Sequence, residues 1–193
     1  DPESNLKNNR FNDGKCDNKG RFYAGTMNEK DNKPTGNFYI LYSDLSFKKI
    51  DKNYIVANGP TFTLDYKTAY FTDTRKGKIY KSKLYKNGKI KNKKIFISIP
   101  KTEGRPDGMT TDSNGNLWVA IFGGSCINQY NDKGKKINSI KLPISCPTSC
   151  VFGGIDLKTL FITTASFKLN TLQRKKEINA GSLFSVNLKK NGV

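Results

Sequence analysis

The chain has 193 residues, of which 35% are hydrophobic and 11% aromatic, and it carries a formal net charge of +18 at pH 7 without a single histidine. This is the composition of one globular domain, and no stretch approaches the ~18 consecutive apolar residues of a membrane-spanning helix. The missing imidazole excludes Ser-His-Asp and Cys-His catalysis and a His-ligated zinc site.

Four segments of the chain repeat one pattern, in which a polar turn that begins with Asp precedes a run of β-branched and aromatic residues. The aligned residues are Asp17, Asp65, Asp112 and Asp156. Their spacings are 48, 47 and 44 residues, and each run is typical of a β-strand. The pattern predicts strands over residues 17–24, 65–72, 112–119 and 156–163.

A second predicted strand follows each of the first, and each begins with glycine: residues 36–42, 77–84, 124–130 and 181–188. Hairpin signals at Asn87-Gly88 and Asp132-Lys133-Gly134 then predict a further strand in two repeats, over 95–99 and 137–142. No long segment has apolar residues at a helical period. Repeats of this length are typical of β-propeller blades, so we expect an all-β propeller with about four blades. A β-sandwich is the alternative, but it does not explain the repeat.

Lysine dominates the positive charge, because only five of the 34 basic residues are Arg. Since Arg is the usual reader of phosphate groups, we attribute the charge to a general compositional bias and do not expect nucleic acid as a partner. A protein that binds a polyanion stays an alternative, and its affinity would fall steeply as the salt concentration rises. The longest basic cluster, residues 86–94, predicts a lysine-rich hairpin at a sheet edge.

The four cysteines are Cys16, Cys126, Cys146 and Cys150. They lack the spacing of a zinc site and are too sparse for a disulfide framework. Reduced thiols and a cytoplasmic location are therefore favoured.

Polar residues recur immediately before each of the four Asp-led strands. The segments are 12–14, 58–60, 107–109 and 148–150, and the first three contain Asn or Asp followed by Gly. Each alone is an ordinary turn dipeptide. A propeller closes into a ring, so residues at equivalent positions of its repeats lie around one axis. Three such residues therefore favour a shared metal or substrate site, made by Asn12, Asn58 and Asp107. Their amide and carboxylate oxygens suit Ca²⁺, Mg²⁺ or Mn²⁺.

Taken together, these segments resemble the SMP-30/gluconolactonase/regucalcin-like family. The residues that carry the resemblance extend over nearly the whole chain: 10–15, 17–27, 58–59, 64–66, 70–74, 106–109, 112, 115, 117–120, 147–150, 152–154 and 181. The resemblance implies a six-bladed β-propeller. It also implies a divalent-metal lactonase that hydrolyses sugar lactones to aldonic acids, although some members are described as calcium-binding proteins.

The resemblance assigns roles to four residues. Asn58 and Asp107 match metal-ligand positions for one divalent ion, Ca²⁺, Zn²⁺, Mn²⁺ or Mg²⁺, and Asp107 also matches the candidate general base. Arg10 and Asn12 match positions that bind the oxygens of the substrate.

The family's third ligand is a Glu of the first blade, and by the same alignment roughly two N-terminal blades lie outside the 193 residues. Residues 1–193 are therefore expected to form a single partial propeller domain. Its last blade is expected to end at residues 191–193, before an outer strand.

We therefore expect a metal-dependent lactonase with a small sugar lactone as its partner and no membrane association. A non-catalytic calcium-binding or interaction propeller is the alternative, and the missing Glu favours it for these residues. The sequence leaves the lactone, the metal and the oligomeric state open.

Overall fold

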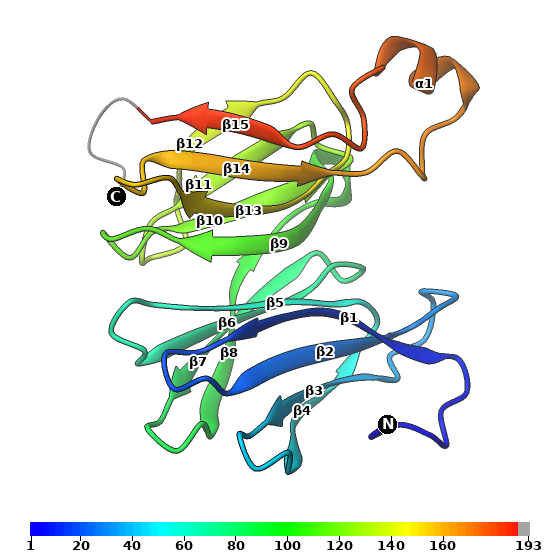
Figure 1. Cartoon of the computed structure of the whole chain (residues 1–193). Helices are drawn as coiled ribbons and strands as arrows, with labels where there is room; N and C mark the ends of the chain where they lie inside the picture. Colours follow the sequence, from blue (N-terminus) through cyan, green and yellow to red (C-terminus); the bar gives the residue numbers. More distant parts are fainter. Residues whose placement is uncertain (189–193) are drawn as a thin grey trace. The chain divides into compact units, whose positions relative to one another are not determined.

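Antiparallel β-strands make up nearly all of the regular structure in the computed structural model, which describes residues 1–188 (Figure 1). The chain divides into two units, residues 1–98 and the residues from 99 onward. Each unit contains two sheets, and in every sheet the strands are hydrogen-bonded in chain order. This meander is the arrangement expected of a propeller blade.

The first unit contains two four-stranded sheets. The strands of the first sheet are β1 (Asn9–Cys16), β2 (Phe22–Asn28), β3 (Gly36–Leu41) and β4 (Phe47–Tyr54). Those of the second sheet are β5 (Ala57–Phe62), β6 (Thr68–Asp73), β7 (Lys78–Leu84) and β8 (Ile90–Ser98). The predicted lysine-rich hairpin joins β7 to β8, and β8 is the edge strand of its sheet, as expected.

The second unit contains a four-stranded and a three-stranded sheet among the described residues. A short 3₁₀ helix, η1 (Lys101–Glu103), precedes the first of them. The strands are β9 (Arg105–Thr111), β10 (Leu117–Phe122), β11 (Cys126–Tyr130) and β12 (Lys136–Lys141), then β13 (Pro147–Gly153), β14 (Thr159–Thr164) and β15 (Phe184–Asn187). The expected end of the last blade at residues 191–193 lies outside the described part of the chain.

The connection between β14 and β15 contains α1 (Thr171–Lys176), the one α-helix within residues 1–188. Asn170 caps it by accepting the Gln173 N–H, and the Gln173 side chain accepts the Asn170 N–H in return. No helix in the described chain is long and apolar enough to cross a membrane.

The aligned Asp of every repeat has the same structural role. Each side chain accepts a hydrogen bond from the backbone N–H two residues later, at 2.9–3.1 Å, which closes the turn between the first two strands of its sheet. The repeat in the sequence is therefore a repeat of turns. The strands predicted after the four Asp residues are β2, β6, β10 and β14, and the glycine-led strands that follow them are β3, β7, β11 and β15.

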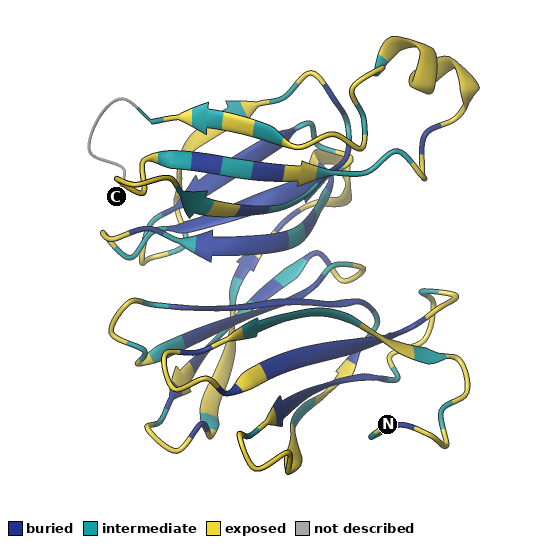
Figure 2. Ribbon diagram, viewed as in Figure 1, coloured by how far each residue is buried: buried dark blue, intermediate teal, exposed yellow. Residues whose placement is uncertain are grey.

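The core of each unit lies between its two sheets. In the first unit, Phe38 of β3 meets Phe71 of β6 edge to face, with ring centroids 4.8 Å apart. In the second unit, Trp118 of β10 packs in the same way against Phe152 of β13, at 5.7 Å. Figure 2 shows that the second strands β2, β6 and β10 are buried, whereas the outer strands β4, β8 and β12 are mostly exposed.

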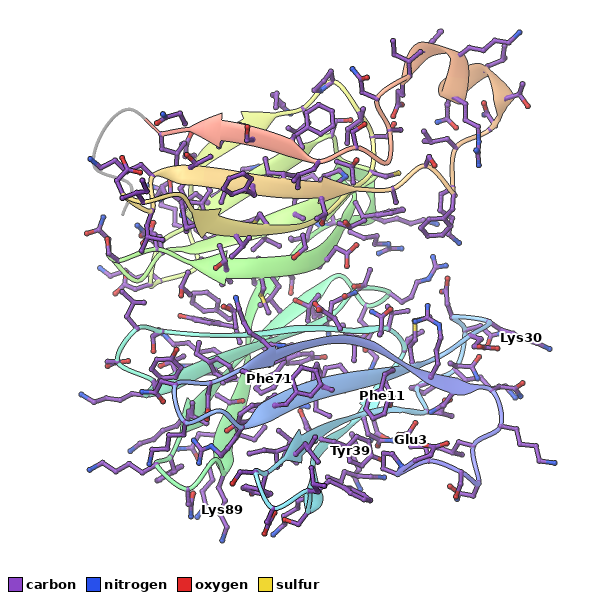
Figure 3. All side chains as sticks on the ribbon, viewed as in Figure 1. Glu3, Phe11, Lys30, Tyr39, Phe71 and Lys89 are labelled. Atoms are coloured by element: carbon purple, nitrogen blue, oxygen red, sulfur yellow. The ribbon has the colours of Figure 1, made fainter. Side chains whose placement is uncertain are left out.

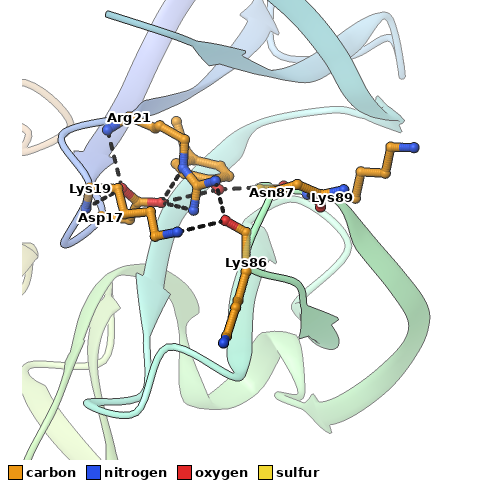
Figure 4. Close-up of polar contacts among 8 residues, drawn as sticks. Asp17, Lys19, Arg21, Lys86, Asn87 and Lys89 are labelled. Atoms are coloured by element: carbon orange, nitrogen blue, oxygen red, sulfur yellow. Dashed lines mark hydrogen bonds and ion pairs between the residues drawn. The ribbon is translucent and has the colours of Figure 1, made fainter.

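Polar contacts reinforce the packing of the two sheets in the first unit. Arg21, next to β2, is buried and donates from Nε to Asp17 at 2.7 Å and from Nη1 to the Lys86 carbonyl oxygen at 2.9 Å (Figure 4). Lys19 Nζ donates to the same carbonyl at 3.2 Å. The β1–β2 turn is thereby bound to the β7–β8 turn.

A buried carboxylate holds the segment before β1 in place. Glu3 is 5% exposed and accepts hydrogen bonds from Thr26 Oγ1 at 2.9 Å, from the Tyr39 hydroxyl at 3.0 Å and from the Asn37 amide. Its second oxygen accepts from Asn9 Nδ2 at 2.8 Å. Glu3 and Tyr39 lie beside each other in Figure 3. This network ties residues 1–9 to β2 and β3.

Candidate functional site

The first strand of each sheet, namely β1, β5, β9 and β13, is irregular at the same point. The register against the second strand shifts there, so extra residues bulge from the ladder. The bulged residues are Asn12 in β1, Gly59-Pro60 in β5, Asp107-Gly108 in β9 and Thr148 in β13. Bulges re-aim side chains, and these occur at or beside the polar positions that the repeats place in phase.

In the first unit, hydrogen bonds connect three of the predicted site residues in series. Arg10 Nη1 donates to Asn12 Oδ1 at 3.2 Å, and Asn12 Nδ2 donates to Asn58 Oδ1 at 3.0 Å. Asn58 Nδ2 donates in turn to Thr74 Oγ1 at 2.8 Å. The structure therefore brings Arg10, Asn12 and Asn58 together, from two different strands.

The orientation of Asn58 follows from these partners. Its amide nitrogen is fixed by Thr74, so its carbonyl oxygen faces Asn12. The residue is 6% exposed, whereas Arg10 is exposed at the surface. A carbonyl oxygen accepts two hydrogen bonds or ligand contacts, so Asn58 Oδ1 retains capacity for a cation.

Asp13 is a site neighbour that the sequence argument did not single out. Its carboxylate accepts the backbone N–H groups of Gly59 and Gly14, both at 2.8 Å, and so fixes the β5 bulge to β1. Burial raises the pKa of the Asp13 carboxyl above its ordinary value, although the two N–H groups and the charge of Lys15 oppose this shift. The signal in the sequence was its position inside the Asn12-Asp13-Gly14 segment.

A largely apolar pocket of about 500 Å³ borders the same strand. Asn12 and Asp13 contribute to its wall, together with the rings of Phe11, Phe22 and Tyr39. Phe11 is labelled in Figure 3 and is 49% exposed. The face of the first sheet therefore offers apolar surface immediately beside the amide of Asn12.

Asp107 lies in the bulge of β9 in the second unit and is half-buried. Burial raises the pKa of the nearby Cys146 thiol, and the negative charges of Glu177 and Asp107 add to that effect. Glu177 accepts the Ser145 N–H at 2.6 Å, which ties the β14–β15 connection to the start of β13. The convergence of Asp107 with Asn12 and Asn58 stays a prediction.

The residues present fit a hard divalent cation better than a soft one. Within residues 1–188, no three His, Cys, Asp or Glu side chains come together as a metal site, and no described cysteine forms a disulfide. A metal held by this chain would therefore need an amide oxygen. Asn58 offers one, with the orientation of its side chain already fixed, and Ca²⁺, Mg²⁺ and Mn²⁺ accept such ligands.

Comparison with known proteins identifies relatives over most of the chain. Residues 1–166 match the SMP-30/Gluconolactonase/LRE-like region. The chain is 39% identical over 185 residues to the putative sugar lactone lactonase YvrE of Bacillus subtilis, and the match covers 95% of this chain and 63% of that protein. It is 37% identical over 189 residues to regucalcin of Xenopus laevis, with 93% and 62% covered. The chain spans less than two thirds of the length of these relatives.

Solved structures of known proteins are also similar to this chain. A calcium-binding protein, regucalcin, from Agrobacterium tumefaciens superposes with a TM-score of 0.91 at 26% identity, covering 96% of this chain and 63% of that one. A luciferin-regenerating enzyme superposes with a TM-score of 0.88 at 33% identity, covering 100% and 65%. The fold is a β-propeller, and the four sheets are four of its blades.

Proposed function

Because the chain belongs to the SMP-30/gluconolactonase/LRE-like family, we propose that it is the greater part of a divalent-metal-dependent lactonase that hydrolyses sugar lactones. The name of the Bacillus subtilis relative supports the lactone as substrate, and the regucalcin relatives support a metal ion. The observation that carries this function is the series of hydrogen bonds from Arg10 through Asn12 to Asn58, at the bulges of two neighbouring first strands.

Asn58 and Asp107 would hold the metal ion, which supplies Lewis acidity toward the lactone carbonyl oxygen when bound. Asn58 brings a buried amide oxygen with a fixed orientation. Asp107 brings a negative charge from the corresponding bulge of the second unit. Both assignments follow from the sequence positions of the two residues.

Arg10 and Asn12 would bind the substrate. The Arg10 guanidinium has five N–H groups, and its Nη1 donates to the Phe11 carbonyl oxygen and to Asn12 Oδ1. The remaining N–H groups can donate to the oxygens of a lactone and stabilise negative charge that develops on its carbonyl oxygen.

Asp107 would act as the general base. Its carboxylate takes a proton from the water whose oxygen bonds to the carbonyl carbon. The ring C–O bond then breaks, and the ring oxygen takes that proton from Asp107 to become a hydroxyl group of the aldonic acid. None of the four described cysteines is in a disulfide, and we propose a reducing, cytoplasmic location on the basis of these thiols.

Lactone hydrolysis tests this function. We expect the protein to release acid from glucono-δ-lactone in a pH-stat assay with Mn²⁺, Mg²⁺, Ca²⁺ or Zn²⁺, and to lose that activity with a chelator. Asp107→Ala should reduce kcat by at least ~100-fold, because general bases contribute 10²–10⁴-fold. Asp132→Ala, which removes an exposed turn carboxylate of the same unit, should leave kcat unchanged. Metal binding by calorimetry without any turnover would instead support a non-catalytic calcium-binding propeller.

A further inference from the structure

A second surface pocket, of about 330 Å³, lies on the second sheet, away from the candidate site residues. Four lysines contribute to its wall, together with two hydroxyl residues and one amide residue. They are Lys67, Lys81, Lys83, Lys94, Thr68, Ser82 and Asn92. No carboxylate lines this pocket among the described residues. The wall therefore combines carbon surface with four positively charged side chains.

The strand register places lysines opposite lysines. Lys81 of β7 pairs with Lys94 of β8, and Lys83 pairs with Lys91. Like charges directly opposite each other in a ladder destabilise a sheet. Two such pairs in succession are unfavourable unless something negative lies between them.

A bulge at Asn92 makes this arrangement possible. Asn92 adopts a left-handed backbone with φ of 57°, and the β7–β8 register shifts between Lys81 and Lys83. As a result Lys93 points away from the pocket, and its neighbour Lys94 returns to the pocket wall.

The positive charge of Lys93, in the same hairpin, is balanced by a carboxylate and by two aromatic rings. Its Nζ lies 2.6 Å from Asp51 Oδ2 and within 5 Å of the ring centroids of Tyr54 and Tyr80. Lys81 of the pocket contacts aromatic rings in the same hairpin and the neighbouring strand. Lys81 Nζ lies over the rings of Phe96 and Tyr70, at 5.1 and 5.9 Å.

Of the other pocket lysines, Lys67 has a carboxylate partner in Asp65 at 3.7 Å, in an exposed pair. Exposed pairs of this kind contribute little to stability. Lys83 Nζ lies over the Tyr85 ring at 5.2 Å, which is a contact with an uncharged group.

The chemistry of the wall defines the class of ligand. Lysine ammonium groups are compact point charges with three donors each, and they bind phosphate as point charges rather than through the planar fork of Arg. The pocket volume of about 330 Å³ suits a small molecule. A long polyanion would instead need a groove or a continuous stripe of charge.

We propose that the pocket between Lys67, Lys81, Lys83 and Lys94 binds a small, multiply charged phosphate group, either as a free anion or as a phosphate ester. The anion lies against the facing pair Lys81 and Lys94, accepts hydrogen bonds from the ammonium groups of the four pocket lysines, and reduces the repulsion between β7 and β8. Thr68 and Asn92 add neutral donors at the rim of the pocket.

Calorimetric titration and thermal unfolding of the protein test this site, with inorganic pyrophosphate for the free anion and glucose 6-phosphate for the ester. We expect saturating pyrophosphate to raise the Tm by roughly 2–4 °C, compared with sodium chloride of equal ionic strength. The double variant Lys81→Gln/Lys94→Gln should weaken binding by ~10-fold or more, because each lost charge-assisted hydrogen bond is worth that much. The matched control is Lys48→Gln/Lys52→Gln on β4, which removes the same charge from exposed lysines and should change the affinity less than about 2-fold.

Lys94→Glu gives a readout that does not depend on binding. It converts the Lys81–Lys94 pair into an attractive pair, so it should raise the Tm at low salt without any anion and abolish the response to pyrophosphate. Binding of either ligand that depends on the pocket lysines supports the site, and the stronger of the two identifies its source. Equal binding by the pocket variant and the control, or an effect no larger than that of chloride, would overturn it. The proposal would also be overturned if the lysine substitutions weakened the binding of duplex DNA but not the binding of pyrophosphate or glucose 6-phosphate.

Discussion

The two units bring their first strands together in different ways. In the first unit, β1 and β5 are linked by side-chain hydrogen bonds, from Asn12 to Asn58 at 3.0 Å and from the Gly59 N–H to Asp13 at 2.8 Å. In the second unit, β9 approaches β13 so closely that a Cβ on Gly108 would run into Ser149. The bulge is the same, but polar contacts hold it in one unit and close packing in the other.

The difference shows that the bulge does not depend on one kind of contact. A polar link fixes the direction of each side chain, as in Asn58, whereas a glycine contact fixes only the separation of the backbones. The first unit is therefore expected to be sensitive to the loss of hydrogen-bonding groups, and the second unit to added volume.

The largest expected effect on stability comes from Gly108→Ala. Its Cβ would meet Ser149 and would lie 2.8 Å from the Thr148 carbonyl oxygen, so the strands must separate. We expect a loss of about 3 kcal/mol in the free energy of unfolding, measured by urea denaturation. Adding Ser149→Gly should recover part of this loss, because it removes the side chain that is struck. No recovery in the double variant would contradict the packing explanation.

A smaller effect is expected from Asn58→Ala. The change removes the acceptor of one Asn12 hydrogen bond and the donor to Thr74, and should cost about 1–2 kcal/mol by the same measurement. Asn58→Asp keeps an acceptor for Asn12, and the Thr74 hydroxyl can donate to the new carboxylate. This variant should therefore lose less stability than the alanine variant, and a larger loss would contradict the polar-link explanation.

The smallest effect concerns pH. Because burial raises the pKa of Asp13 above 3.8, the folded state holds its proton more tightly than the unfolded state. The protein should therefore lose stability relative to Asp13→Asn as the pH rises from about 3.8 through the folded-state pKa, and the difference should become constant above it. Urea denaturation of both proteins across this range measures the difference, and a flat profile would show that Asp13 titrates normally.

Much of the fold could be predicted from local sequence, because its repeat is made of turns. Asp17 and its counterparts bond to the backbone only two residues away, so their effect is visible in a short segment. The second and third strands of each sheet follow from these turns and from the glycines after them. The outer strand β4 was missed because its sequence, residues 47–54, is polar and mostly exposed and has no hairpin signal before it.

The site was only partly predictable, for a physical reason. Asn12 and Asn58 could be selected because the repeats place them in phase, and the structure shows their hydrogen bond. The bulges depend on the register between strands, and the contact of Asp13 with Gly59 joins residues 46 positions apart. Neither the bulges nor this contact can be recognised from a local sequence pattern. The roles of these residues and of Asp107 stay predictions.

The four matching bulges have a consequence for how such a protein can change. An extra residue in a bulge lies outside the alternation of the strand, so its side chain can be replaced without turning its neighbours to the opposite face. Asn12 in β1 and Thr148 in β13 are single residues of this kind, at which new chemistry can be tried while the core stays intact. Proteins of this fold could change substrate specificity through a few single substitutions at such positions. The same positions are suitable for protein engineering.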